Sequence, residues 1–278
     1  MGDAASALRE AAQGLSEISD SPRLDAELLM AHALQIGRSE LLLKLPQLKA
    51  PVEFFALLER RRKSEPIAHI ICIKEFWGLD FQITPDVLIP RPDSELLIEE
   101  AVRIFVSANP QRIADLGTGS GALMLAALHE FPDARGLGLD ASAAALQIAH
   151  NNADSLGLAD RASFLLLDWT EADWTRSFES GFDLILANPP YVSTHAALSA
   201  DVAGFEPHRA LFAGEDGLDD YRIIIPALEK LLSPTGIAML EIGFDQAKPV
   251  SKIAADSGYH IELKQDFGGN DRLLILRR

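Results

Sequence analysis

The chain has 278 residues, a length that fits one large domain or a medium domain joined to a smaller one. Hydrophobic residues make up 48% and charged residues 24% of the chain, which excludes a fibre and a disordered polypeptide. The formal net charge is −16, which disfavours binding to the phosphate backbone of nucleic acids, although the same charge also fits a role in solubility alone.

Several further classes of protein are not expected from the sequence. No apolar run reaches the roughly 18 residues that span a bilayer, so a membrane is not an expected partner. The start of the chain has no basic region followed by an apolar core, so no secretory signal is expected. Cys72 is the one cysteine, which excludes a disulfide within the chain and a cysteine-based zinc cage. The cytoplasm is the expected location, and no metal is expected.

The first part of the chain predicts helices. Apolar residues recur at helical spacing over Ala4–Ile18, and Ser21-Pro22 is typical of an N-cap that opens a helix to about Ile36. Two more helices are expected from Ser39 and from Pro51, and the last ends in four basic residues, 60–63. Cations suit a helix C-terminus, so this cluster favours a structural role over a nucleic-acid patch. A small helical domain is predicted over residues 1–66.

The pattern then changes to that of strands. Apolar residues between Ala68 and Leu88 suggest a strand pair that turns near Gly78, and we predict a β-hairpin linker over residues 67–90. A proline-rich stretch follows, and a helix is expected from Ser94 to about Val106.

Residues 91–278 predict an α/β domain. Strands are expected at Arg112–Leu116, Arg135–Leu139, Ala162–Leu167, Phe182–Ala187, Ile237–Ile242, Tyr259–Lys264 and Arg272–Leu276. Helices are expected at Gly121–His129, Ser142–Leu156, Leu218–Leu232 and Gln246–Ala255. This alternation predicts a doubly wound, mostly parallel sheet of seven strands, in which the last two strands pair as an antiparallel edge.

A glycine-rich loop stands directly after the first of these strands. It runs Asp115-Leu116-Gly117-Thr118-Gly119-Ser120-Gly121 and opens the next helix. Its alternate glycines let the backbone turn tightly and approach a ligand, and the helix N-terminus offers free N–H groups. With Ala122 the loop also fits a loose dinucleotide fingerprint, so alone it indicates a nucleotide-like cofactor.

Acidic and aromatic residues follow the next two strands. Asp140 can accept both hydroxyls of a ribose, or cap the following helix, or do both. Asp168 and Trp169 offer a carboxylate and a flat indole that can hold an adenine ring. Ligands of open α/β sheets bind at the carboxyl ends of the strands, where these residues are expected.

The sequence Asn188-Pro189-Pro190-Tyr191 follows the buried strand Phe182–Ala187. Two prolines restrain the backbone and remove donors, so that nearby carbonyls stay free as acceptors. Asn188 adds an amide oxygen, and Tyr191 adds a flat face with a hydroxyl. The quartet is suited to hold a planar NH2 group.

At this point the chain resembles the class I methyltransferases that use S-adenosylmethionine. Residues 115–121 look like their cofactor loop, and Asp140 looks like their ribose acid. Asn-Pro-Pro-Tyr is shared by enzymes that methylate planar amino groups, namely exocyclic base amines and glutamine amides.

Further motifs are similar to those of the peptide chain release factor glutamine methyltransferases, the HemK/PrmC family. They are Leu88-Ile89-Pro90-Arg91-Pro92-Asp93-Ser94-Glu95, Glu65–Ile70 with Glu75-Phe76-Trp77, Phe205-Glu206-Pro207 with Ala210-Leu211, Asp216-Gly217-Leu218-Asp219, Glu241-Ile242-Gly243 with Gln246, and Asp266 to Arg272. The resemblance covers nearly the whole chain. Cys72 stands where the family usually has glycine, which puts the local hairpin geometry in question, and Ser94 replaces a threonine.

The resemblance implies methyl transfer from S-adenosylmethionine to the side-chain amide nitrogen of the glutamine in the Gly-Gly-Gln motif of release factors, with S-adenosylhomocysteine as product. It implies that residues 117–121, Asp140, Asp168, Trp169 and Asn188 bind the cofactor. The Asn188 oxygen and the Pro189 carbonyl would accept the amide hydrogens, and Pro190 and Tyr191 would complete the catalytic motif.

The helical domain is expected to dock the substrate protein, because a glutamine alone offers little surface for recognition. The acidic charge argues against a direct nucleic-acid partner, and the enzyme is expected to be a monomer. Three alternatives stay open. One is a glutamine methyltransferase acting on a ribosomal protein. Another is an exocyclic-amine nucleic-acid methyltransferase. The third is a non-enzymatic nucleotide-binding module.

Overall fold

The computed structural model describes residues 2–278; residue 1, where the predicted helical domain begins, lies outside the described residues. The chain divides into two compact units, one formed by Met1–Ile73 with Leu198–Glu206, the other by Lys74–Ala197 with Pro207–Arg278. The boundaries expected at residues 66 and 90 remain a prediction. The segment Leu198–Glu206, from the middle of the chain, belongs to the first unit.

The first unit is helical. Its helices are α1 (Ala4–Gly14), α2 (Pro22–Leu34), α3 (Arg38–Lys44), α4 (Val52–Arg62), α5 (Ile67–Ile71) and α9 (Ala200–Phe205). The apolar faces of α1 to α5 form one core around the fully buried Leu8, Leu29 and Phe54. The Arg61 guanidinium is buried in this unit and donates to the Asp25 carboxylate over 2.8 Å.

The linker contains a helix where the sequence indicated strand. Ile67–Ile71 form α5, because Pro66 precedes its first turn and the β-branched residues pack into the helical core. The helix ends at Cys72, whose backbone is left-handed with φ +58°. The hairpin that follows consists of β1 (Ile73–Phe76) and β2 (Leu79–Gln82), and it turns at Trp77 and Gly78 as expected.

The second unit is built on a sheet of seven strands. They are β3 (Arg112–Leu116), β4 (Arg135–Asp140), β5 (Ala162–Leu166), β6 (Phe182–Ala187), β7 (Leu232–Glu241), β8 (His260–Gln265) and β9 (Asp271–Arg277). Their order is β5-β4-β3-β6-β7-β9-β8. The first five pair in parallel, while β9 is antiparallel to both β7 and β8. The predicted mostly parallel sheet of seven strands is confirmed. The last two strands pair in an antiparallel manner as expected, and β8 is the outermost strand on their side of the sheet.

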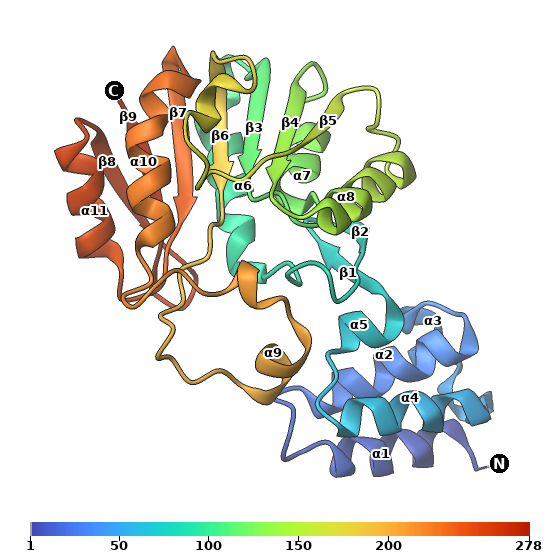
Figure 1. The fold of residues 1–278 in the computed structure, drawn as a ribbon. Coiled ribbons are helices and arrows are strands. Elements are labelled where there is room, and N and C mark those ends of the chain that lie inside the picture. The colour runs from blue at the N-terminus through green and yellow to red at the C-terminus, as the bar shows by residue number, and fades with distance from the viewer. Residues whose placement is uncertain (1) are drawn as a thin grey trace. The chain divides into compact units, whose positions relative to one another are not determined.

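Helices cover both faces of the sheet. They are α6 (Glu95–Ile104), α7 (Ala122–Glu130), α8 (Ala143–Ser155), α10 (Asp219–Leu231) and α11 (Ala247–Asp256). Figure 1 shows α10 and α11 on one face and α6 and α7 on the other. The buried side chains of α10 and α11 form one core with alternate residues of the strands, such as Ile185 and Leu240. The chain order reverses at β3, and ligands bind open α/β sheets at such a reversal.

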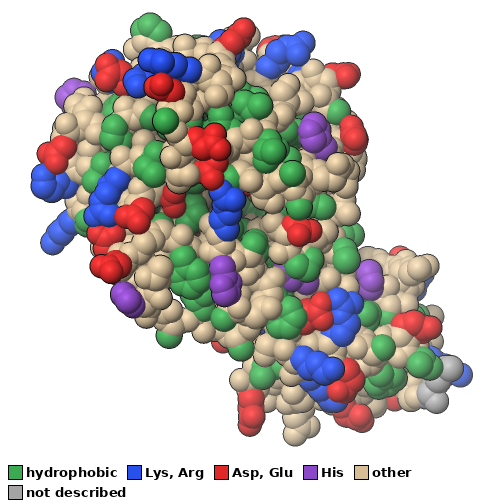
Figure 2. Space-filling view, viewed as in Figure 1, with side chains coloured by type: hydrophobic (Ala, Val, Ile, Leu, Met, Phe, Trp, Pro, Cys, Tyr) green, Lys and Arg blue, Asp and Glu red, His purple; other side chains and the backbone are tan. Residues whose placement is uncertain are grey.

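Charges of both signs alternate on the surface. On the face of the α/β unit that is visible in Figure 2, basic side chains lie beside acidic ones. Arg222, for example, pairs with Asp216 at 2.5 Å and with Asp219 at 2.9 Å. Such exposed pairs contribute roughly 0–1 kcal/mol each. Among residues 2–278, no helix combines the length and the apolar character needed to cross a membrane.

Candidate active site

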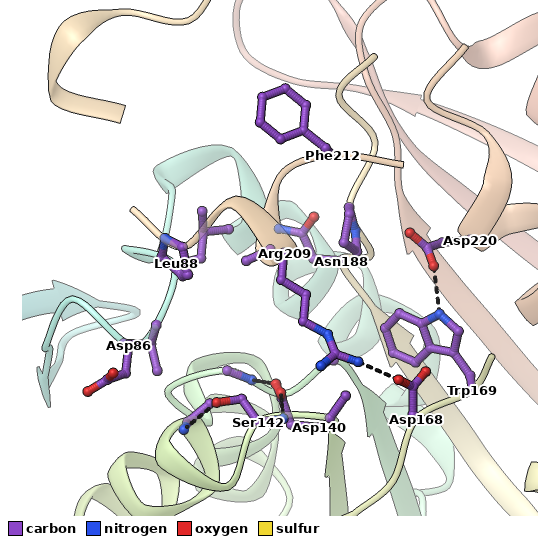
Figure 3. A pocket seen from close by; sticks show the side chains of 18 of the residues that line it. Asp86, Leu88, Asp140, Ser142, Asp168, Trp169, Asn188, Arg209, Phe212 and Asp220 are labelled. Atoms are coloured by element: carbon purple, nitrogen blue, oxygen red, sulfur yellow. Dashed lines mark hydrogen bonds and ion pairs between the residues drawn. The ribbon is translucent and has the colours of Figure 1, made fainter. Parts of the chain in front are cut away.

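A cavity of about 340 Å³ opens at the carboxyl ends of β3, β4 and β6 in the α/β unit (Figure 3). It is lined by Asp86, Val87, Leu88, Gly117, Gly119, Asp140, Ala141, Ser142, Ala145, Asp168, Trp169, Thr170, Asn188, Pro190, Pro207, Arg209, Ala210, Phe212 and Asp220. The lining thus includes residues from the glycine loop, from the ends of three strands and from the Asn-Pro-Pro-Tyr motif, which are far apart in the sequence.

The glycine loop after β3 has left-handed backbone at Gly117, Gly119 and Gly121, with φ of +77°, +54° and +83°. A Cβ atom on Gly117 would lie 3.1 Å from the Trp169 ring, so the indole packs directly against the bare backbone. The loop is held by N–H groups of Gly117 and Thr118, which donate to the Leu139 carbonyl at 2.9 and 2.8 Å. Glycine is needed here both for the turn and for the close approach of Trp169.

Thr118 and Ser120 of the loop do not line the cavity, and each is held by a hydrogen bond to a side chain outside the loop's glycines. The Thr118 hydroxyl donates to the buried Asp115 carboxylate at 2.7 Å. The Ser120 carbonyl accepts from the Asn152 amide at 2.8 Å. Thr118 and Ser120 are themselves buried, as the packing of the loop requires. Gly121 also lies outside the cavity lining, and its positive φ starts α7.

Asp140 ends β4 and is half-buried at the cavity wall. Its Oδ2 accepts from the Gly119 N–H at 2.9 Å, and its Oδ1 accepts from the Ser142 N–H at 2.8 Å. Burial raises the pKa of this carboxyl group, while the two N–H groups oppose that shift. Ser142, whose hydroxyl accepts from the Ala145 N–H, is the N-cap of α8. The Ala141 N–H also interacts with this carboxyl group. A carboxylate has about four acceptor positions, so a position remains for a hydroxyl of a ligand.

The wall formed by Asp168 and Trp169 is held by residues from other segments. The Trp169 Nε1–H donates to the Asp220 carboxylate at 2.6 Å, which sets the plane of the indole. Asp168 accepts from the N–H and the hydroxyl of Thr170 and forms an ion pair with Arg209. These donors lower the pKa of Asp168, so it is a carboxylate. Figure 3 shows the Arg209 side chain reaching over the cavity toward Asp168.

Asn188 and Pro190 line the cavity, whereas Pro189 is buried and Tyr191 is half-buried behind them. The Asn188 Nδ2 donates to the Ser94 hydroxyl oxygen at 3.3 Å. The Tyr191 hydroxyl donates to the Glu241 carboxylate at 3.2 Å, and burial together with that carboxylate raises the pKa of the phenol. The tetrapeptide is therefore anchored on residues from two other segments.

The backbone after this tetrapeptide is held by two of the motifs from the sequence. The Gln246 Nε2 donates to the Tyr191 carbonyl at 2.9 Å and to the Gly217 carbonyl at 3.2 Å. A Cβ atom on Gly217, whose φ is +73°, would lie 2.3 Å from the Tyr191 carbonyl oxygen. Gly217 and Gln246 thus support the Asn188 loop.

The structure brings together most of the residues that the sequence singled out, and their functional roles stay predictions. Gly117, Gly119, Asp140, Asp168, Trp169, Asn188 and Pro190 border the cavity, whereas Thr118, Ser120, Gly121, Pro189 and Tyr191 are not among its lining residues. Sequence reasoning missed Arg209, Phe212, Asp220 and the segment 86–88. Among residues 2–278, no group of three or more His, Cys, Asp or Glu side chains is placed to hold a metal ion.

Two family models match this chain. The PrmC N-terminal domain matches residues 6–71, and a methyltransferase domain matches residues 109–262.

Curated relatives match over most of their length. A release factor glutamine methyltransferase of Rhodospirillum rubrum is 40% identical over 93% of this chain and 80% of its own. One from Cereibacter sphaeroides is 40% identical over 99% of this chain and 98% of its own. One from Moorella thermoacetica is 39% identical over 93% of this chain and 92% of its own.

Solved structures show the same fold. The catalytic domain of hMettl16, in complex with the MAT2A 3'UTR hairpin 1, has a TM-score of 0.58 at 14% identity, and covers 80% of each chain. A methyltransferase from Pyrococcus furiosus has a TM-score of 0.54 at 17% identity, and covers 78% of this chain and 98% of its own.

Proposed function

This chain belongs to the family of release factor glutamine methyltransferases, and we propose that its cavity is the site at which that reaction takes place. The enzyme transfers a methyl group from S-adenosylmethionine to the side-chain amide nitrogen of the glutamine in the Gly-Gly-Gln motif of a release factor. The observation that carries the assignment of the site is that Asn188 borders the same cavity as Asp140 and Trp169.

The cavity fits an adenosyl cofactor. Asp140 lines the cavity and can accept from the ribose hydroxyls in addition to the backbone N–H groups that hold it. Trp169 offers an indole whose plane is set by Asp220, against which a flat ring can pack. The bare backbone of Gly117 and Gly119 lines the space between them. When bound, S-adenosylmethionine supplies a methyl group on a positively charged sulfur, so the cofactor brings its own leaving group.

Asn188 holds the glutamine amide through hydrogen bonds. An amide nitrogen is a poor nucleophile, because its lone pair is delocalised into the carbonyl. The Asn188 Oδ1 and the Pro189 carbonyl accept its two hydrogens in this proposal. Such acceptors favour a nitrogen that is gaining positive charge, so their bonds strengthen as the transition state forms. Tyr191 packs beside the amide.

Substitution of Asn188 tests this assignment. We expect Asn188→Ala to lower kcat by about 10²–10³-fold, the usual loss when a hydrogen-bond partner of the transition state is removed. Cofactor affinity, measured by titration calorimetry, should fall only modestly, because Asn188 supplies one of several cofactor contacts and the glycine loop and Asp140 are intact. Near-normal turnover by the variant would refute the assignment of Asn188.

The proposal extends to the partner and the place of the reaction. The helical unit docks the folded release factor, since a glutamine side chain alone offers little surface for selecting one protein. It exposes apolar side chains that a partner can cover, among them Leu43 on α3 and Val52 on α4, which are 80% and 63% exposed. The reaction takes place in the cytoplasm, on free protein and without nucleic acid. The monomeric state is a prediction that sedimentation can test.

A further inference from the structure

The Ser94 hydroxyl lies between the Asn188 amide and a buried carboxylate. Ser94 ends the 3-10 helix Pro92–Ser94 and is 3% exposed, and Glu241 is the last residue of β7 and is 1% exposed. Ser94 Oγ lies 2.5 Å from Glu241 Oε2, while Asn188 Nδ2 lies 3.3 Å from Ser94 Oγ. Three segments that are distant in sequence thus form one chain of hydrogen bonds.

The direction of this chain follows from the number of hydrogens. A serine hydroxyl has one hydrogen, and a carboxylate only accepts. The Ser94 hydrogen is therefore given to Glu241, a charge-assisted bond that is stronger than one to a neutral group. Ser94 Oγ is then left as an acceptor, and the group that faces it must be the NH2 of Asn188.

Glu241 is held in place on its other side as well. Its Oε1 accepts from the Tyr191 hydroxyl at 3.2 Å, and its backbone carbonyl accepts from the Tyr221 hydroxyl at 2.7 Å. Burial raises the pKa of Glu241, while the Ser94 and Tyr191 hydroxyls that donate to it oppose this shift. The charge of Arg272, which pairs with Asp93 at 3.2 Å, also opposes the shift and favours the ionised carboxylate. Glu241 is therefore a rigid acceptor for Ser94.

The two ends of an asparagine amide have nearly the same shape, so hydrogen bonds decide which end points where. We propose that Ser94 and Glu241 are positioning residues that hold the Asn188 NH2 group away from the substrate, so that its Oδ1 faces the target amide. This inference rests on the proposed function. A reversed Asn188 would present N–H groups to the N–H groups of the substrate, and the stabilising bonds would be lost.

The test compares Ser94→Ala with Ser94→Thr, since threonine keeps the hydroxyl and stands at this position in the family motif. We expect Ser94→Ala to lower kcat for methyl transfer to a release factor about tenfold to a hundredfold, the effect of losing one buried hydrogen-bond partner. The cofactor Kd and the KM for the release factor should stay within about threefold of the wild-type values. Ser94→Thr, which keeps the hydroxyl, should retain most of the wild-type kcat.

A double variant separates positioning from a general loss of structure. If Ser94 acts through Asn188, the loss from Ser94→Ala should disappear in the Asn188→Ala background. Independent, multiplying losses in the two positions would overturn the inference, as would an unchanged kcat in Ser94→Ala. Glu241→Gln provides a second variant, and it should also lower kcat, because its NH2 group allows the Ser94 hydrogen to turn toward Asn188.

A readout that needs no activity keeps this inference distinct from the proposed function. The side-chain 15N–1H2 signals of Asn188, assigned by their absence in Asn188→Ala, should shift in Ser94→Ala and stay near their wild-type position in Ser94→Thr. Signals that do not respond to Ser94→Ala would overturn the hydrogen-bond chain. An absence of methyl transfer by the wild-type enzyme, with the signals responding as expected, would instead refute the proposed function alone.

Discussion

Asp115 is an acidic side chain inside the α/β unit, and we predict that its charge makes the folded protein less stable as the pH rises. It lies near the end of β3 and is 1% exposed. Burial raises its pKa from 3.8 to about 7, although the Thr118 hydroxyl and the Met124 N–H oppose the shift. The folded state therefore keeps a proton that the unfolded state loses near pH 4.

The size of the effect follows from the two pKa values. Between pH 5 and pH 8 the unfolded carboxyl is ionised throughout, whereas the folded carboxyl ionises near pH 7. Because the folded state binds more protons over this range, its stability falls as the pH rises, by about 2–3 kcal/mol for this one group. Asp115→Asn removes this pH-dependent part of the free energy of unfolding, since the asparagine amide resembles the protonated acid and does not ionise. The advantage of the variant over the wild type should thus grow by about 2–3 kcal/mol from pH 5 to pH 8.

Urea unfolding at several pH values, followed by tryptophan fluorescence, measures this difference. Trp77, Trp169 and Trp174 all belong to the α/β unit, so the signal reports the unit that contains Asp115. The matched control is Asp133→Asn, which removes one negative charge from an exposed position. If wild type and Asp115→Asn lose stability in parallel between pH 5 and pH 8, the reasoning about the buried charge is wrong.

Three further predictions concern the cofactor, the linker and the partner. Asp140→Ala should raise the KM for S-adenosylmethionine more than it lowers kcat, because ribose contacts are alike in the ground and transition states; unchanged cofactor binding by calorimetry would reduce Asp140 to a support of the loop. Cys72→Gly should stabilise the helical unit by about 0.5–1 kcal/mol, measured by urea unfolding that is followed by circular dichroism. Glycine adopts the left-handed backbone without the strain that cysteine has there, and this gain should exceed the entropy that glycine adds to the unfolded chain. No gain in stability would contradict the assigned strain. Leu43→Glu should lower kcat/KM for an intact release factor about tenfold and leave that for a short Gly-Gly-Gln peptide unchanged, whereas equal losses would exclude docking on this surface.

Much of the α/β unit could be predicted because its signals are local. Arg112–Leu116 and Phe182–Ala187 are apolar runs between turn residues, and the structure has strands with the same bounds. The strand expected at Ile237–Ile242 is longer in the structure, where it begins at Leu232 and ends at Glu241. Gly236 fits there because a Cβ atom would lie 2.4 Å from the Phe182 carbonyl oxygen, a packing constraint that the sequence does not show.

Elements that depend on tertiary contacts could not be predicted. The isoleucines of α5 fit a strand or a buried helix equally well, and the core of the first unit decides in favour of the helix. Nothing local indicates that Leu198–Glu206 joins the first unit. The structure explains why the family usually has glycine where this chain has Cys72. The backbone at this residue is left-handed, a conformation that glycine adopts without strain.

The candidate site was predictable where chemistry follows directly from position at a strand end. Asp140 is the last residue of its strand, Trp169 and Asn188 each follow a strand, and parallel strands bring their carboxyl ends to one edge. Arg209 and Asp220 could not be found in this way, because a loop and a helix start bring them to the cavity through the fold of the whole unit.

Methyl transfer to an intact release factor tests the central claim most directly. Purified enzyme is incubated with the unmodified factor and S-adenosylmethionine that is labelled in the methyl group, and the products are analysed by peptide mass spectrometry. We predict that one methyl group per factor appears on the glutamine of the Gly-Gly-Gln motif, and that ribosomal proteins and nucleic acids in parallel reactions remain unlabelled. Label on one of those substrates, with an unlabelled release factor, would contradict the account.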